Sequence, residues 1–160
     1  MAEPHQVLAA LSEEEAGAAL LRCCGSRRWV AAMLAERPWA STEALHAAAE
    51  RLWAGLPRAD WLEAFAAHPR IGAGGSGWSA QEQGRVADAA AGTRSELAAA
   101  NEAYFARHGF IFIVCATGKS AEEMLALLRQ RLPHDTDTEV VLAAAEQARI
   151  TRLRLEKLAT

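Results

Sequence analysis

The chain has 160 residues and a mass of 17.2 kDa, enough for one domain that buries a core without disulfides or metal ions. Hydrophobic residues make up 51% and charged residues 23%, which is typical of a globular protein and excludes a disordered or fibrous one. The net charge of -3, from 17 basic and 20 acidic side chains without a basic cluster, argues against nucleic acid as a partner.

The composition predicts an all-α protein, because alanine, the strongest helix former, accounts for 38 residues. The first predicted helix follows Ser12, which forms a capping-box pattern with Glu15, and it closes at Gly25. A second helix covers Arg27–Arg37 and must stop before Pro38, since proline disfavours helical backbone in the residue before it.

Two further helices lead to a glycine-rich loop. Ser41 is the expected cap of a helix over Thr42–Ala54, and the next helix covers Arg58–Ala67. Residues 68–77 read HPRIGAGGSG and hold four of the eleven glycines, so they cannot form regular structure. We expect the longest loop of the chain here, with His68 at its start.

Two capping boxes follow this loop. The pattern that starts at Ser79 predicts a helix to Ala91. The pattern that starts at Thr93 predicts a helix to Arg107, with Gly109 just beyond the helix end in the position that favours a left-handed glycine.

Residues 110–116, FIFIVCA, form the one β-like run of the chain. A lone strand has no sheet to join, so either this run is a buried extended connector, which we expect, or the β-like pattern misleads. The backbone N–H and C=O groups of a buried extended segment must find partners. We therefore expect some of these groups to serve a ligand.

The last two helices complete the predicted organisation. A fourth capping box at Ser120 predicts a helix to Arg131, and either Thr136 or Asp137 is the expected cap of a final helix. The sequence shows no internal repeat and no linker. We predict one domain over residues 1–160, a bundle of about seven to eight helices.

His68 and Glu82 are the first candidates for chemistry. A histidine at a helix end in a glycine-rich loop is suited to acid–base catalysis, and the alternative is a structural interaction with the helix dipole. Capping alone explains Glu82, because the same spacing recurs three more times in the chain. The helix start from Ser79 to Gln83 nevertheless offers free amides and a side-chain amide to a polar or anionic ligand.

An arginine in the last helix is the third candidate, because a guanidinium grips a carboxylate with two parallel hydrogen bonds. Arg152 and Glu156 are four residues apart on an expected solvent-facing side. Arg154 lies between Leu153 and Leu155 and is the least conventional surface arginine. The alternative is that it only covers the helix surface.

Other classes of site find no support in the sequence. The histidines and cysteines lack any zinc-ligand spacing, so we expect no metal, and the loop lacks the glycine patterns that hold nucleotide phosphates. No apolar window is long enough to cross a membrane. The three cysteines without a disulfide pattern and the missing targeting signal predict a cytoplasmic protein.

Four motifs in series carry a resemblance to a known family. They are HPRIG at 68–72, WSxxEQ at 78–83, NEAYFxRHGFIFIVCATGKS at 101–120 and RITRLRLEKL at 149–158. Together they resemble 2-oxo-4-hydroxy-4-carboxy-5-ureidoimidazoline (OHCU) decarboxylase, and the similarity runs from about Trp29 to the C-terminus.

The resemblance implies an all-helical homodimer that converts OHCU to (S)-allantoin in urate degradation, without a cofactor. It implies that His68, Glu82 and Arg154 are the catalytic residues. The positions that it implies for substrate binding are Pro69, Ser79, Gln83, Phe112, Ile113, Val114, Cys115 and Ala116.

Two departures from the family pattern concern the pocket mouth. The interval from His68 to Glu82 is shorter than in animal and plant members, and residues 108–112 read HGFIF where animal members have FGFPF. Two alternatives stay open at this point. One is a catalytically silent helical interaction module of the same fold, and the other is a metal-dependent hydrolase using His68 and Glu82, for which the ligand spacing is wrong.

Overall fold

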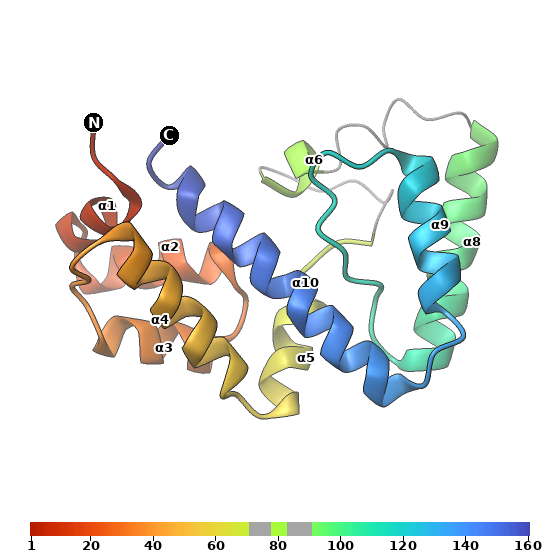
Figure 1. The fold of residues 1–160 in the computed structure, drawn as a ribbon, viewed down its shortest axis with the longest axis horizontal. Coiled ribbons are helices and arrows are strands. Elements are labelled where there is room, and N and C mark those ends of the chain that lie inside the picture. Colours follow the sequence, from red (N-terminus) through yellow and green to blue (C-terminus); the bar gives the residue numbers. More distant parts are fainter. Residues whose placement is uncertain (71–77, 83–90) are drawn as a thin grey trace. The chain divides into compact units, whose positions relative to one another are not determined.

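A computed structural model describes residues 1–70, 78–82 and 91–160 (Figure 1). All regular elements in these ranges are α-helices, which confirms the predicted class. They are α1 (Pro4–Ala10), α2 (Glu13–Cys23), α3 (Arg27–Ala35), α4 (Thr42–Ala54), α5 (Arg58–Ala66), α6 (Trp78–Glu82), α8 (Ala91–His108), α9 (Ala121–Arg131) and α10 (Thr136–Lys157). None of the helices in the described ranges has the length and apolar character needed to span a bilayer.

The chain folds into two compact units, each described by itself. The first unit contains Met1–Ala64 and Gln147–Thr160, and the second contains Phe65–Glu146. Helix α10 therefore contributes its first part to the second unit and its remainder to the first. The expected single domain over residues 1–160 stays a prediction.

The first unit is built on helices from the N-terminal half. Helix α2 packs on α3, α3 packs on α4, and α1 contacts both α2 and α4. Its core contains the fully buried Leu20, Trp29, Met33 and Leu45. The indole N–H of Trp29 donates to the carbonyl of Ala49 at 3.1 Å, so the largest core side chain leaves no polar atom unsatisfied.

The structure confirms the helix starts predicted from serine caps. The Ser12 hydroxyl accepts from the Glu15 N–H at 3.1 Å, and the Ser120 hydroxyl accepts from the Glu123 N–H at 3.1 Å. Ser41 caps α4 in the same way. Each serine satisfies one of the amides that a helix start leaves without an intrahelical partner.

Other predicted starts were wrong. Helix α8 begins at Ala91, so Thr93 lies inside its first turn and does not cap it. Helix α10 is capped by Asp135, whose Oδ1 accepts from the Thr138 N–H at 2.8 Å. The predicted caps Thr136 and Asp137 both lie inside α10.

Two smaller differences concern α6 and the N-terminus. Helix α6 begins at Trp78, one residue before the predicted cap at Ser79, and residues 83–90 of that predicted helix lie outside the described residues. Helix α1 was not predicted. Pro4 occupies its first turn, where a missing N–H costs nothing, and the Glu3 N–H donates to Gln6 Oε1 at 2.8 Å.

In the second unit, α8 and α9 lie side by side (Figure 1). Helix α8 ends as predicted, because Gly109 has φ +79° and donates its N–H to the Phe105 carbonyl at 2.9 Å. Residues 110–116, the extended segment, follow without helical turns. All are buried except Ile111, which is half-buried. The predicted buried connector is thus confirmed.

Candidate active site

One edge of the extended segment is held by side chains of the second unit. The Ile113 carbonyl accepts from Arg131 Nη1 at 2.6 Å. The Cys115 N–H donates to Glu146 Oε1 at 3.1 Å, and the Cys115 carbonyl accepts from Lys119 Nζ at 2.7 Å. These bonds replace the partners that a neighbouring strand would provide.

The opposite edge of the extended segment lacks such partners among the described residues. Backbone groups alternate sides along an extended chain, so those of Phe112, Val114 and Ala116 point away from the edge that is held. Among the described residues, no hydrogen bond reaches the N–H or C=O of Phe112 and Val114, or the N–H of Ala116. All three residues are at most 5% exposed. Buried backbone groups of this kind are suited to a ligand rich in amide and carbonyl groups.

His68 lies where α5 ends. Its N–H donates to the Phe65 carbonyl at 3.2 Å, which continues the last turn of the helix. The Phe65 ring packs against Phe110 with centroids 5.4 Å apart. The structure therefore places the end of α5 that bears His68 against the start of the extended segment. The side chains of His68 and Pro69 are half-buried.

Glu82 is the last residue of α6 and is half-buried. Burial raises the pKa of the Cys115 thiol, and the negative charge of Glu82 adds to this effect. The Glu82 carboxylate therefore lies within electrostatic range of the extended segment. The backbone of Ser79 lies in α6, and Gln83 lies outside the described residues.

Arg154 belongs to the first unit and is 8% exposed. Its Nη1 donates to the carbonyl of Arg22 at 3.1 Å. Arg152, in contrast, is exposed and lies 3.7 Å from Glu156 Oε1. The predicted difference between these two arginines is confirmed. The predicted convergence of Arg154 with His68 and Glu82 stays a prediction.

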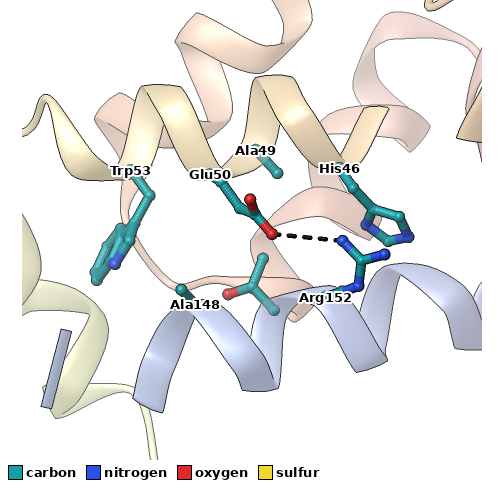
Figure 2. A pocket seen from close by; sticks show the side chains of 7 residues that line it. His46, Ala49, Glu50, Trp53, Ala148 and Arg152 are labelled. Carbon is teal, nitrogen blue, oxygen red and sulfur yellow. Dashed lines mark hydrogen bonds and ion pairs between the residues drawn. The ribbon is translucent and has the colours of Figure 1, made fainter. Parts of the chain in front are cut away.

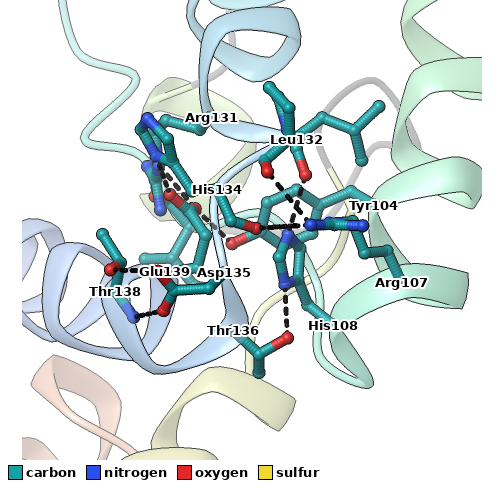
Figure 3. Close-up of polar contacts among 12 residues, drawn as sticks. Tyr104, Arg107, His108, Arg131, Leu132, His134, Asp135, Thr136, Thr138 and Glu139 are labelled. Carbon is teal, nitrogen blue, oxygen red and sulfur yellow. Dashed lines mark hydrogen bonds and ion pairs between the residues drawn. The ribbon is translucent and has the colours of Figure 1, made fainter.

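A buried polar cluster that no sequence pattern indicates is centred on Glu139 (Figure 3). Glu139 is fully buried. Its Oε1 accepts from Tyr104 Oη at 2.6 Å and from Arg131 Nε at 2.9 Å, and its Oε2 lies 2.8 Å from His134 Nδ1. Burial, followed by the hydrogen bond to Glu139, raises the pKa of Tyr104, so the phenol stays protonated and donates.

The described residues offer no reactive thiol. Cys23, Cys24 and Cys115 are all buried and free. Burial raises the pKa of Cys23 and of Cys24 to about 12, so both stay protonated near neutral pH. In the same ranges, no three His, Cys, Asp or Glu side chains gather in a way that could hold a metal ion.

A shallow hollow in the first unit lies between α4 and α10, and Figure 2 shows Glu50 and Arg152 pointing toward each other across it. Its lining residues are His46, Ala49, Glu50, Trp53, Ala148, Thr151 and Arg152. His46 is 4% exposed, and neither ring nitrogen has a hydrogen-bond partner among the described residues. Burial, reinforced by the charge of Arg152, lowers the pKa of His46, although Glu156 Oε1 lies 3.4 Å from its Nε2.

The buried His46 should make the protein sensitive to acid. Its ordinary pKa is 6.5, and the folded value is lower, so below that pH the unfolded state binds more protons than the folded state. The free energy of unfolding must then decline as the pH falls. We expect His46→Phe to show a smaller decline than the parent between about pH 7.5 and about pH 5 in urea unfolding curves.

His5 provides the matched control for this measurement. It is half-buried in the same unit, and its Nδ1 lies 3.1 Å from Thr42 Oγ1. We expect His5→Phe to retain the parental decline. An identical decline in the parent and His46→Phe would contradict the assignment of this acid sensitivity to His46.

Comparison with known proteins places these features in a family. A family model described as OHCU decarboxylase matches residues 9–156. The chain is 39% identical over 145 residues to the uric acid degradation bifunctional protein TTL of Arabidopsis thaliana, covering 85% of this chain and 45% of that protein. It is 28% identical over 137 residues to the uric acid degradation bifunctional protein PucL of Bacillus subtilis (strain 168), covering 82% and 28%. The chain thus spans less than half the length of either bifunctional protein.

Solved structures show the same likeness. A crystal structure of OHCU decarboxylase in the presence of (S)-allantoin matches with a TM-score of 0.80 at 35% identity, covering 92% of this chain and 98% of that chain. A crystal structure of (S)-allantoin synthase matches with a TM-score of 0.73 at 20% identity, covering 94% and 52%. The second likeness shows a shared fold alone.

Proposed function

The chain belongs to the OHCU decarboxylase family, and from this premise we propose that it decarboxylates OHCU to (S)-allantoin in urate degradation. The observation that carries the proposal is the structural likeness, over nearly the full length of both chains, to an OHCU decarboxylase studied with (S)-allantoin. The unpaired backbone edge of the extended segment supports it, because OHCU and allantoin are rich in amide and carbonyl groups.

The reaction can proceed on the substrate's own electron sink. When the bond to the carboxylate breaks, its electron pair must be accommodated, and the ring imine beside the carboxylated carbon accepts it. This step releases carbon dioxide, and uptake of a proton from solvent by the ring nitrogen leaves a neutral enol. Loss of the hydroxyl proton and addition of a proton to the ureido-bearing carbon then give allantoin. Addition from one face gives a single enantiomer.

We assign the three catalytic candidates by their chemistry. His68 delivers or relays the proton to the ureido-bearing carbon, because imidazole exchanges protons near neutral pH. Glu82 holds His68 or polarises the substrate hydroxyl. Arg154 orients the departing carboxylate through its two-pronged guanidinium. The partly buried His68 and Glu82 and the buried Arg154 suit these roles.

We assign substrate binding to the positions that the family resemblance implies for it. The free backbone edge at Phe112, Val114 and Ala116 is suited to hydrogen bonds with the ring and ureido groups. The remaining assigned positions are Pro69, Ser79, Gln83, Ile113 and Cys115. On family likeness alone, we propose that the chain works as a cytoplasmic homodimer, without nucleic acid or membrane partners.

Turnover by the purified protein tests the proposed function. Freshly generated OHCU is mixed with the protein and followed by circular dichroism. We expect a rapid signal from (S)-allantoin that exhaustive chelation leaves unchanged, because no step needs a metal. Uncatalysed decay has no preferred face and gives no net signal. The absence of a signal above the buffer control would favour the silent interaction module, and loss of the signal on chelation would favour a metal-dependent enzyme.

A further inference from the structure

We propose that Arg131 is a positioning residue of the proposed reaction: it fixes the Ile113 carbonyl and so directs the opposite edge of the extended segment toward the substrate. The inference deepens the proposed function and rests on it. It starts from the contacts of one guanidinium at the end of α9, a helix that itself supplies none of the assigned site residues.

Arg131 is held from three directions. Its Nε donates to Glu139 Oε1 at 2.9 Å, its Nη1 donates to the Ile113 carbonyl at 2.6 Å, and its guanidinium carbon lies 4.6 Å from the centre of the Phe112 ring. The side chain is only 10% exposed. A buried cation with two directional bonds and a ring contact has one orientation, and it imposes that orientation on the peptide it binds.

Glu139 in turn fixes Arg131. The carboxylate accepts from Tyr104 as well as Arg131, and His134 lies against its second oxygen (Figure 3). The Tyr104 ring also packs edge-on against Phe112, with centroids 5.5 Å apart. The cluster therefore contacts the extended segment through both the Ile113 carbonyl and the Phe112 ring.

Stability alone explains this arrangement poorly. Arg131 Nη2 is buried and has no hydrogen-bond partner among the described residues. Burying a charged group with an unsatisfied N–H is costly, and apolar side chains of similar volume often stabilise a core at least as well as a buried ion pair. Control over the direction of the Ile113 carbonyl gives the guanidinium a role that an apolar side chain lacks.

The orientation of the Ile113 carbonyl affects substrate binding through the geometry of the peptide chain. In an extended segment, the orientation of the Ile113 carbonyl sets the directions of the N–H and C=O groups of Phe112 and Val114 on the other edge. Those groups are the unpaired ones assigned to the substrate. A small rotation would weaken several hydrogen bonds to the bound ligand together, so the affinity for substrate and for product would fall.

Arg131→Lys tests the inference. Lysine keeps the charge but cannot bind Glu139 and the Ile113 carbonyl with the same planar fork. We expect a rise in KM and in the dissociation constant of (S)-allantoin of about 10-fold or more, with kcat lowered less. Arg129→Lys is the matched control, because Arg129 lies two residues earlier in α9, is 58% exposed and pairs with Glu96 at 3.3 Å. We expect the control to stay within about two-fold of the parent.

Thermal melting of each variant separates positioning from folding. If Arg131→Lys is folded and its KM and allantoin affinity match the parent, the inference is overturned. It is also overturned if activity falls only in proportion to the folded fraction. A second variant, Tyr104→Phe, leaves both Arg131 bonds in place and removes one partner of Glu139, so we expect a smaller rise in KM.

The same measurements distinguish this inference from the proposed function. If the parent does not turn over OHCU, the proposed function fails and the inference falls with it. If the parent is active and Arg131→Lys matches it, only the positioning role fails.

Discussion

His68→Asn is expected to reduce kcat for (S)-allantoin formation by about 10²- to 10⁴-fold, the range that a positioned general acid contributes. Asparagine approximates the size of histidine and can hydrogen-bond, but it cannot carry a proton near neutral pH. KM should change little, because the unpaired backbone edge that we assign to substrate binding is not altered. Single-turnover circular dichroism with freshly generated OHCU gives the rate and the enantiomer in one experiment.

His5→Asn is the control for this substitution. His5 is half-buried like His68, but it lies in α1, where its ring contacts Thr42. We expect the control to retain parental kcat. If His68→Asn formed (S)-allantoin at the parental rate, His68 would not be the proton donor, and Glu82 would become the first candidate.

The helices were predictable where their signals are local. The caps predicted at Ser12, Ser41 and Ser120 are confirmed, because each capping hydrogen bond joins residues three apart in the chain. Thr93 carried the same signal but lies inside α8, since helical residues before it extend the helix. The N-cap of α1 is Glu3, which is outside the usual Ser, Thr, Asp and Asn set, so the sequence carries no such signal for that helix.

The sequence predicts the extended segment itself, but it does not predict the side chains that hydrogen-bond to its backbone. A run of aromatic and β-branched residues between a glycine-closed helix and a serine-capped one identifies a buried connector. Arg131 and Glu139, however, are separated from Ile113 by 18 and more residues, and basic side chains in the last turn of a helix are usually solvent-exposed. Only the tertiary structure shows that this one is buried.

Arg154 presents the opposite case, because its neighbours Leu153 and Leu155 gave a local signal. Apolar residues on both sides of a charged residue in a helix indicate that the charged residue lies at the boundary between core and solvent. The structure places Arg154 in the buried class and Arg152, two residues earlier, in the exposed class. The sequence thus supports the choice of Arg154 as the carboxylate-binding arginine, and its chemistry can be tested directly.

Arg154→Lys is expected to lower kcat/KM for OHCU by about 10²-fold, because a point-like ammonium cannot hold a planar carboxylate with two parallel bonds. Loss of the hydrogen bond to the Arg22 carbonyl should also lower the free energy of unfolding by about 1 kcal/mol. Urea unfolding measures that cost separately from steady-state kinetics. The affinity for (S)-allantoin, which has lost the carboxylate, should fall much less than kcat/KM.

Arg152→Lys completes the comparison. It makes the same chemical change in the same helix, at a side chain that is 49% exposed and paired with Glu50 at 3.4 Å. Because exposed ion pairs contribute little, we expect parental kcat/KM and stability. Equal losses of OHCU turnover and allantoin affinity in Arg154→Lys would contradict a carboxylate-specific role, since a residue that only shapes the pocket would affect both ligands alike.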